Sequence, residues 1–262
     1  MIHYEVYGEG PPIVLLNGIM MSTKSWKPFI EPLSAANKLI LMDFYDQGES
    51  DRHEEPYKIE KQAEAVKSVL DNLGLEKVTL TGISYGGYVS LKFALTYPSY
   101  LSRLMIFNSA ARSGPWLKEM GQSWIMSMDN PDHLYAATIP VVYSKAFYNN
   151  NIEWAESRKV VLTEQVFKDK NFLDGLTRLI KSTEGYDVVD QLGKIQARTL
   201  IVASDEDSIA PYNDQKIMHE GIKNSDLVLM PGCGHASMYE KPDLFASLML
   251  GFANTKFEGI KV

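Results

Sequence analysis

The sequence predicts an α/β protein with a mostly parallel central sheet, flanked by helices and interrupted by one helical insertion. Short apolar runs, typical of strands buried on both faces, alternate along the chain with segments of helical periodicity. The alternation stops between residues 112 and 186, where helical patterns occur without a convincing strand, and then resumes. A chain of 262 residues is long enough to form one domain of this kind with an insertion.

The first part of the chain supplies most of the predicted strands. An alternating segment at the N-terminus and four apolar runs indicate strands at residues 1–7, 13–16, 39–42, 78–81 and 104–107. Apolar residues at steps of three and four predict an amphipathic helix over 59–73, and a second helix over 88–97 is stopped by Pro98.

The pattern after the insertion completes the sheet. Strands are expected at 199–203 and 227–230, with a helix near Pro211 between them and a closing helix from about 240 to 253. We therefore assign residues 1–111 and 187–262 to a core domain. Residues 112–186 are assigned to an inserted helical cap.

Composition excludes several classes of function. The formal net charge is −7 and the acidic residues are spread along the chain, so nucleic acid is not an expected ligand. The single cysteine, Cys233, allows no intramolecular disulfide and no cysteine-rich metal site. The N-terminus does not resemble a signal peptide and no apolar run approaches the ~18 residues that cross a bilayer. We expect a cytoplasmic protein that does not bind membranes.

The segment Gly82-Ile83-Ser84-Tyr85-Gly86 fits the pattern Gly-x-Ser-x-Gly and lies directly between a predicted strand and a predicted helix. Such a turn holds the serine in a strained conformation, and its glycines remove side chains that would block the close approach. Backbone N–H groups at the helix N-terminus favour the negative charge of a tetrahedral oxyanion, and that of Tyr85 is the natural first donor. We predict that Ser84 is a nucleophile; the alternative is a glycine-rich turn that only packs strand against helix.

A nucleophilic serine needs a base that removes its proton. Of the five histidines, only His235 follows the last predicted strand on a glycine-containing loop, 231–235, that can fold back over the sheet edge. The others lie in the first strand, in a charged loop, in the cap and inside a helix: His3, His53, His133 and His219. We predict His235 as the general base and Cys233 as a packing residue, because two positions on one short loop rarely align as nucleophile and base.

The third member must be a carboxylate that accepts a hydrogen bond from the imidazole and fixes its tautomer. Three candidates, Asp205, Glu206 and Asp207, follow the predicted strand 199–203. Acidic residues in a loop before a helix are ordinarily solvated or capping groups. The residues alone barely separate Asp205 from Asp207.

The order Ser84, Asp207, His235 and the sequence around each residue resemble the α/β-hydrolase superfamily over essentially the whole chain. The branch that it resembles contains small capped esterases, lactonases, proline iminopeptidases and cofactor-free haloperoxidase-like proteins. The resemblance implies the α/β-hydrolase fold. In that family the acid commonly lies four residues before a proline, which favours Asp207, four residues before Pro211.

The resemblance also implies a second oxyanion donor, the backbone N–H of Ile19, after the pair Asn17-Gly18 where relatives have His-Gly. A second departure is Asp46-Gln47-Gly48, where relatives often show Gly-His-Gly. Asn108, after the strand ending at residue 107, removes an alternative acid position used in some relatives. A serine nucleophile in place of aspartate disfavours the haloalkane dehalogenases and epoxide hydrolases of the superfamily.

An apolar stripe in the predicted cap consists of Trp116, Met120, Trp124 and Met128, which recur every four residues. The stripe either packs the cap on the core or contacts substrate, and we name Trp116, Met120 and Trp124 as candidate pocket residues.

These observations predict a serine hydrolase that cleaves a carboxylic ester of a small, partly apolar molecule through an acyl-enzyme. The alternatives are a thioesterase, lactonase, aminopeptidase or cofactor-free lyase with the same triad, or a ligand receptor with slow turnover. No phosphate-binding loop, dinucleotide-binding motif or metal-spaced histidine cluster occurs, so no cofactor and no metal are expected.

Overall fold

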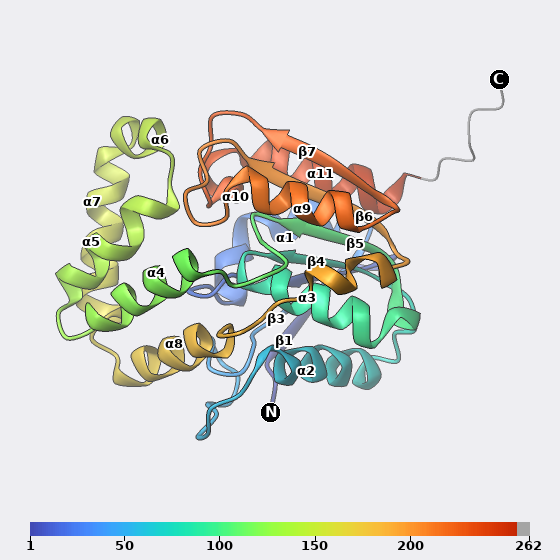
Figure 1. Ribbon diagram of the computed structural model, residues 1–262, viewed down its shortest axis with the longest axis horizontal. Helices are drawn as coiled ribbons and strands as arrows, with labels where there is room; N and C mark the ends of the chain where they lie inside the picture. The colour runs from blue at the N-terminus through green and yellow to red at the C-terminus, as the bar shows by residue number, and fades with distance from the viewer. Residues whose placement is uncertain (256–262) are drawn as a thin grey trace.

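A computed structural model describes residues 1–255 and contains a seven-stranded sheet within them, in the order β1-β3-β2-β4-β5-β6-β7 (Figure 1). β1 pairs antiparallel with β3, and the remaining neighbours are parallel, so the predicted mostly parallel sheet is confirmed. The strands are β1 (Tyr4–Tyr7), β2 (Pro12–Leu16), β3 (Lys38–Met42), β4 (Val78–Ile83), β5 (Leu101–Phe107), β6 (Arg198–Ser204) and β7 (Ser225–Met230).

Helices cover both faces of the sheet, and alternate residues of each central strand supply the two cores. Val14 and Leu16 of β2 belong to one apolar cluster, whereas Ile13 and Leu15 belong to the other. The first cluster includes residues of α2 (Ile59–Asn72), α3 (Tyr85–Thr96), α9 (Tyr212–Gly221) and the 3₁₀ segment η4 (Val189–Lys194). The second includes residues of η1 (Thr23–Phe29), α1 (Ile30–Ser34), α10 (Ser237–Glu240) and α11 (Pro242–Asn254). A short 3₁₀ turn, η2 (Pro98–Tyr100), leads into β5.

The segment between β5 and β6 is helical and lies to one side of the sheet in Figure 1. We call residues 112–186 the helical insertion. An isolated antiparallel bridge between Arg112 and Asp187 joins its two ends. Its elements are α4 (Pro115–Met126), α5 (Pro131–Val142), α6 (Lys145–Asn150), α7 (Ile152–Val161), the π-helical turn η3 (Leu162–Val166) and α8 (Lys170–Ser182).

An ion pair between the partly exposed Arg178 and the buried Asp46 fastens the helical insertion to the loop after β3. Arg178 of α8 donates to both carboxylate oxygens of Asp46, at 2.6 Å from Nη2 and 3.1 Å from Nε. The Tyr57 hydroxyl donates to the same carboxylate at 2.8 Å. Asp46, a non-glycine residue with a φ of +70°, is therefore held by hydrogen bonds from Arg178 and from Tyr57.

No helix in the described part of the chain is long and apolar enough to cross a bilayer.

Two helix boundaries differ from the sequence-based expectation. α3 begins at Tyr85 rather than at residue 88, so Gly86 and Gly87 lie inside it. Glycine is a weak helix former, but a Cβ on Gly86 would lie 2.6 Å from the Leu16 carbonyl oxygen, so close packing requires it there. The closing helix begins at Pro242, because residues 237–240 form the separate short helix α10.

Candidate active site

Ser84 lies at the turn between β4 and α3 and has backbone angles that are rare for a residue with a side chain. Its φ is +51° and its ψ is −115°, a conformation that costs free energy and that the surrounding structure must enforce. The Ser84 N–H donates to the Phe107 carbonyl at 2.9 Å, and the Ser109 hydroxyl donates to the Ser84 carbonyl at 2.7 Å. Both peptide groups that flank Ser84 are thus anchored to the end of β5.

The glycines of this turn are required by close backbone contacts. A Cβ on Gly82 would lie 2.2 Å from the Gly86 carbonyl oxygen. Real Cβ atoms do not come this close to a backbone atom, so the turn cannot form with alanine at this position unless the backbone moves. The pattern Gly-x-Ser-x-Gly therefore has a steric basis here.

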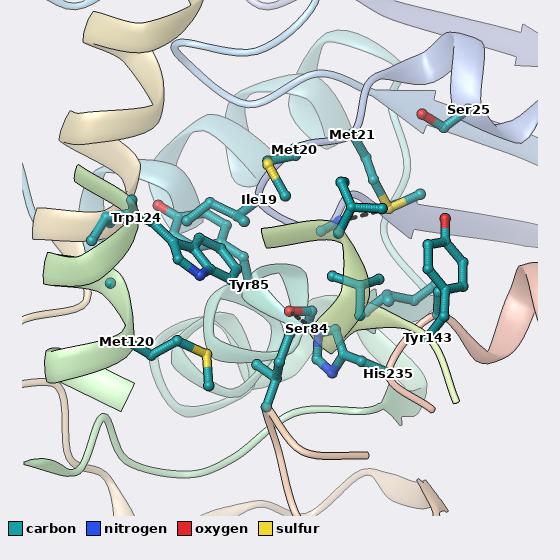
Figure 2. Close-up of a pocket in the computed structure, with 18 of the residues that line it drawn as sticks. Ile19, Met20, Met21, Ser25, Ser84, Tyr85, Met120, Trp124, Tyr143 and His235 are labelled. Atoms are coloured by element: carbon teal, nitrogen blue, oxygen red, sulfur yellow. Dashed lines mark hydrogen bonds between the residues drawn. The ribbon is translucent and has the colours of Figure 1, made fainter. Parts of the chain in front are cut away.

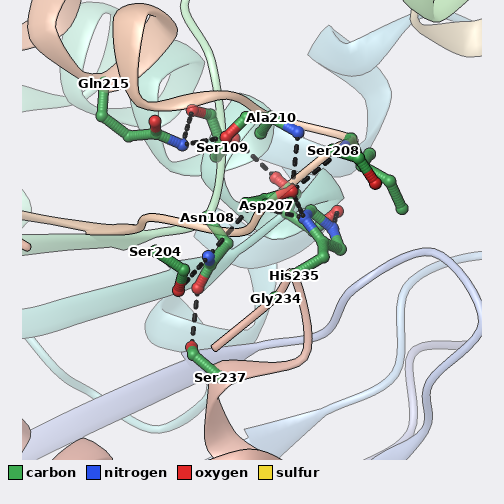
Figure 3. Close-up of polar contacts among 12 residues, drawn as sticks. Asn108, Ser109, Ser204, Asp207, Ser208, Ala210, Gln215, Gly234, His235 and Ser237 are labelled. Carbon is green, nitrogen blue, oxygen red and sulfur yellow. Dashed lines mark hydrogen bonds and ion pairs between the residues drawn. The ribbon is translucent and has the colours of Figure 1, made fainter. Parts of the chain in front are cut away.

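His235 connects Ser84 to Asp207. The Ser84 hydroxyl lies 2.7 Å from Nε2 of His235, and Nδ1 of the same ring lies 2.9 Å and 3.0 Å from the two carboxylate oxygens of Asp207 (Figures 2 and 3). A proton on Nδ1 satisfies the carboxylate and leaves the Nε2 lone pair facing the hydroxyl. His235 is 8% exposed and Asp207 5% exposed. This arrangement can remove a proton from the Ser84 hydroxyl and stabilise the resulting imidazolium.

The carboxylate of Asp207 is buried but accepts several hydrogen bonds. The N–H groups of Ile209 and Ala210 each donate to Oδ1 at 2.9 Å, and Nδ2 of Asn108 donates to Oδ2 at 3.0 Å. Burial alone would raise the pKa of Asp207, but the charge and hydrogen bond of His235, with the bonds from Ala210 and Asn108, hold that pKa below its usual value. Asp207 therefore remains a carboxylate beside the imidazole.

The structure gives different contacts to Asp205 and Asp207, which the residues alone barely separated. Asp207 contacts His235, whereas Oδ1 of Asp205 accepts from the Gly232 and Cys233 N–H groups at 2.7 Å and 3.4 Å. Asp205 thereby fixes the loop that carries His235. The Cys233 thiol donates to the Ser204 hydroxyl at 3.2 Å, and burial raises its pKa, which keeps it a neutral packing residue.

Asn108 has a role that the sequence analysis did not assign. It follows β5 with a φ of +48°, a conformation that asparagine tolerates better than most residues. Its amide group donates to Asp207 and to the Ser204 hydroxyl, and its Oδ1 accepts from the Ser237 hydroxyl at 2.6 Å (Figure 3). Asn108, which occupies a position where some relatives have the acid, thus donates a hydrogen bond to the acid Asp207. The only sequence signal for this role was the position of Asn108 at the end of β5, the strand beside β6, which Asp207 follows.

The loop that carries Ile19 is held by Asn17 and Gln47, two of the residues that depart from the family pattern. Nδ2 of Asn17 lies 3.0 Å from the Met42 carbonyl and 3.1 Å from Oδ1 of Asp43, while its Oδ1 accepts from the Trp26 indole at 2.7 Å. Gln47, which the sequence analysis noted only as a departure, donates to carbonyl groups of this loop. The Ile19 side chain lines the pocket above Ser84, and Tyr85 begins α3 (Figure 2).

A mostly apolar pocket opens onto Ser84 and His235, between the sheet edge and the helical insertion. Met120 and Trp124 of α4 line it (Figure 2). Trp116 does not: its side chain is 64% exposed, and its indole N–H donates to the Ser208 carbonyl at 3.4 Å. Each step of four residues turns a helix by roughly 40° beyond a full turn, so Trp116, at one end of the stripe, faces a different direction from Trp124.

Among the described residues, no cluster of three or more histidine, cysteine or acidic side chains could hold a metal ion.

Comparison with known proteins gives consistent matches. A family model described as the alpha/beta hydrolase fold matches residues 11–147. The crystal structure of an alpha/beta hydrolase enzyme from a Medee basin deep-sea metagenome library is 42% identical, with a TM-score of 0.96 over 99% of this chain and 97% of that one. The putative carbamate hydrolase RutD of Azorhizobium caulinodans is 26% identical over 96% of this chain and 94% of its own. The 2-hydroxy-6-oxo-6-phenylhexa-2,4-dienoate hydrolase of Comamonas testosteroni is 27% identical over 96% and 91%.

Proposed function

Because the chain belongs to the α/β-hydrolase family and is a hydrolase of that type, we propose that it is a serine hydrolase acting on carboxylic esters. Its substrate would be a small, partly apolar ester, cleaved through an acyl-enzyme. The observation that carries the proposal is the hydrogen-bonded chain from the Ser84 hydroxyl through His235 to Asp207, with 2.7 Å and 2.9 Å between the bonded atoms.

Each residue of this chain has a role in the proposed reaction. His235 takes the proton of Ser84 through Nε2 as the hydroxyl attacks the ester carbonyl, and Asp207 stabilises the imidazolium. The N–H groups of Tyr85 and Ile19 hold the oxyanion. His235 then gives its proton to the leaving alcohol and activates a water molecule that releases the acid from Ser84.

The helical insertion is proposed to act as a cap on a core formed by residues 1–111 and 187–262. Met120 and Trp124 would present an apolar surface to the acyl or alcohol part of the substrate. An apolar cover would also exclude bulk water while the serine is acylated. The ion pair between Arg178 and Asp46 would hold this cap on the core, because it joins the insertion to the loop after β3.

Hydrolysis of p-nitrophenyl butyrate by the wild type, Ser84→Ala and Ser99→Ala tests the proposal. Ser99 is exposed and lies in η2 before the first residue of β5, whereas Ser84 follows the last residue of the parallel strand β4. The two serines therefore lie at opposite edges of the sheet, and Ser99→Ala controls for the substitution itself. We expect turnover by the wild type and by Ser99→Ala, and a loss of at least about a thousandfold in Ser84→Ala. Full activity in Ser84→Ala, or none in the wild type, would contradict an esterase with this nucleophile.

A carbamate is the second candidate substrate, since several full-length relatives are named putative carbamate hydrolases. The same residues would attack a carbamate carbonyl by the same steps, because it is also an acyl group with a leaving group. A panel of ester, thioester, lactone, amide and carbamate substrates with a common acyl size, each compared with Ser84→Ala, distinguishes these reactions by kcat/KM.

A further inference from the structure

One residue of the pocket does not fit a purely apolar substrate. Arg158 of α7 lines the same pocket as Ser84 and His235, and it is the one Lys, Arg, Asp or Glu side chain among the described residues that do so. A permanent charge in an apolar pocket costs free energy unless a counter-charge or hydrogen bonds compensate it. The partners of Arg158 therefore decide what the pocket can bind.

The Arg158 guanidinium lies near two aromatic rings, and its Nε–H has no hydrogen-bond partner. The Trp154 and Tyr239 rings each lie with their centroid 5.6 Å from the guanidinium carbon, which is within cation–π range. The Nε atom is shielded from solvent and has no hydrogen-bond partner among the described residues. Stacking on aromatic rings uses the faces of the group and leaves edge N–H donors, Nε–H among them, for other partners.

No acidic side chain in the described part of the chain forms an ion pair with Arg158, although its neighbour Lys159 pairs with Asp132 at 2.9 Å. The nearby carboxylate of Glu240 is already engaged. Its Oε1 accepts from the Ser144 and Gly234 N–H groups at 2.8 Å and 3.0 Å, and its Oε2 accepts from the Ser144 hydroxyl at 2.5 Å. The described residues thus surround the Arg158 guanidinium with aromatic rings and provide no carboxylate to pair with it. An anionic ligand could fill that place.

The position of Arg158 relative to the candidate nucleophile follows from its neighbours. Burial raises the pKa of the Tyr143 hydroxyl, and the positive charge of Arg158 beside it, together with a side-chain hydrogen bond from Arg158, acts in the opposite direction. Tyr143 lies on the His235 side of the pocket, across from Met120 and Trp124 (Figure 2). The charged wall and the apolar wall are therefore on different sides of Ser84.

We propose that Arg158 binds a carboxylate of the substrate, remote from the bond that is cleaved, so that the preferred substrate is an anionic ester with an apolar body. The Nε–H and one Nη–H would form the side-on, two-bond contact that guanidinium makes with carboxylate. This inference rests on the proposed function, because it names the class of substrate for the same site. Lysine could not reproduce the two parallel bonds.

Two pairs of esters that differ in charge but closely match in shape test the proposal. The first pair is 4-carboxyphenyl acetate and 4-carbamoylphenyl acetate, with the charge on the alcohol side. The second is mono-4-nitrophenyl adipate and the same ester with its free acid replaced by a primary amide, with the charge on the acyl side. The variants are Arg158→Met, Arg158→Lys and, as a control on the same helix, Lys159→Met.

Binding is measured first, by calorimetry with Ser84→Ala protein, so that the result does not depend on turnover. In at least one pair we expect the carboxylate to bind about 10- to 100-fold more tightly than its amide, the range for a charge-assisted hydrogen-bonded pair. Adding Arg158→Met should abolish this preference, Arg158→Lys should restore only part of it, and Lys159→Met should leave it unchanged. Equal binding of acid and amide in both pairs, or a preference that survives Arg158→Met, would overturn the proposal.

Turnover separates this inference from the proposed function. With Ser84 intact, the ratio of kcat/KM for acid over amide should fall by the same factor in Arg158→Met, whereas a merely structural role would lower both values and keep the ratio. A binding preference without Ser84-dependent hydrolysis would refute the esterase and leave the carboxylate site standing. Ser84-dependent hydrolysis of both esters with no preference for the acid would refute the carboxylate site alone.

Discussion

The side-chain nitrogen of Gln47 lies 2.8 Å from the carbonyl oxygen of Gly18 and donates a hydrogen bond to it. The Gly18 carbonyl and the Ile19 N–H belong to one planar peptide group, in which the two point in opposite directions. Gln47 also donates to the Ile19 carbonyl at 3.1 Å, so it holds the peptide groups on both sides of Ile19. The direction of the proposed oxyanion donor is therefore set by a side chain from the loop after β3.

Replacing Gln47 with methionine should lower kcat by about 10- to 100-fold, because a misdirected oxyanion donor loses part of its transition-state stabilisation. KM should change by less than about threefold, since the amide does not line the pocket. Steady-state kinetics with p-nitrophenyl butyrate measure both values. The exposed Gln122→Met on α4 is the control. An unchanged kcat in Gln47→Met would show that the bond to Gly18 does not position the donor.

Gly82→Ala should destabilise the fold by more than about 2 kcal/mol, because its Cβ would lie 2.2 Å from the Gly86 carbonyl oxygen. Gly114→Ala is the matched control. Gly114 has no heavy atom within 4 Å of the position that a Cβ would take, and its φ is −76°. Urea unfolding of the three proteins gives the free energies of unfolding. Equal stability of Gly82→Ala and the wild type would mean that the turn is not as tight as described.

Arg178→Met should lower the free energy of unfolding by about 3 kcal/mol, since it leaves the buried carboxylate of Asp46 without its cation. The loss should be smaller in the double variant Asp46→Asn with Arg178→Met, which removes both charges. Lys181→Met, an exposed residue on the same helix, should change stability little. Limited proteolysis should cut the helical insertion first in Arg178→Met. If Arg178→Met is as stable and as resistant to proteolysis as the wild type, the ion pair does not fasten the insertion.

The stability of the protein should depend on pH through Asp207. Its pKa in the folded protein lies below the ordinary 3.8, so ionised Asp207 stabilises the fold fully above pH 3.8. That contribution is lost as the pH falls below 3.8 and through the folded-state pKa. The difference in unfolding free energy between the wild type and Asp207→Asn should therefore narrow with acidification across this range. A difference that stays constant, or widens, would contradict the direction of the shift.

The parts of the fold that the sequence predicts are those encoded locally. The run Val14 to Leu16 is apolar because both of its faces are buried, and the turn at Ser84 is marked by glycines that close packing requires. Strand positions, the mostly parallel sheet and the helical nature of the insertion follow from signals of this kind. Ser84 and Tyr85 could be named without knowledge of the strand order.

The remaining parts depend on which segments become neighbours. Asn108 contacts Asp207 because β5 lies beside β6, and Gln47 contacts Gly18 because β2 lies beside β3. Neither pairing can be deduced from periodicity. Arg158 was overlooked for a similar reason, because the face that α7 turns to the pocket depends on how the insertion docks. Sequence reasoning thus identified residues in local motifs and missed the side chains that position or complement them.

The location of the acyl group during turnover tests the central proposal most directly. Wild-type protein is mixed with p-nitrophenyl butyrate, quenched in acid within the first turnover, digested and analysed by mass spectrometry. The account predicts a butyryl group on Ser84, which should disappear on longer incubation once substrate is exhausted and should not form in Ser84→Ala. A butyryl group on any other residue with Ser84 unmodified, or equally fast ester hydrolysis by Ser84→Ala, would contradict the account.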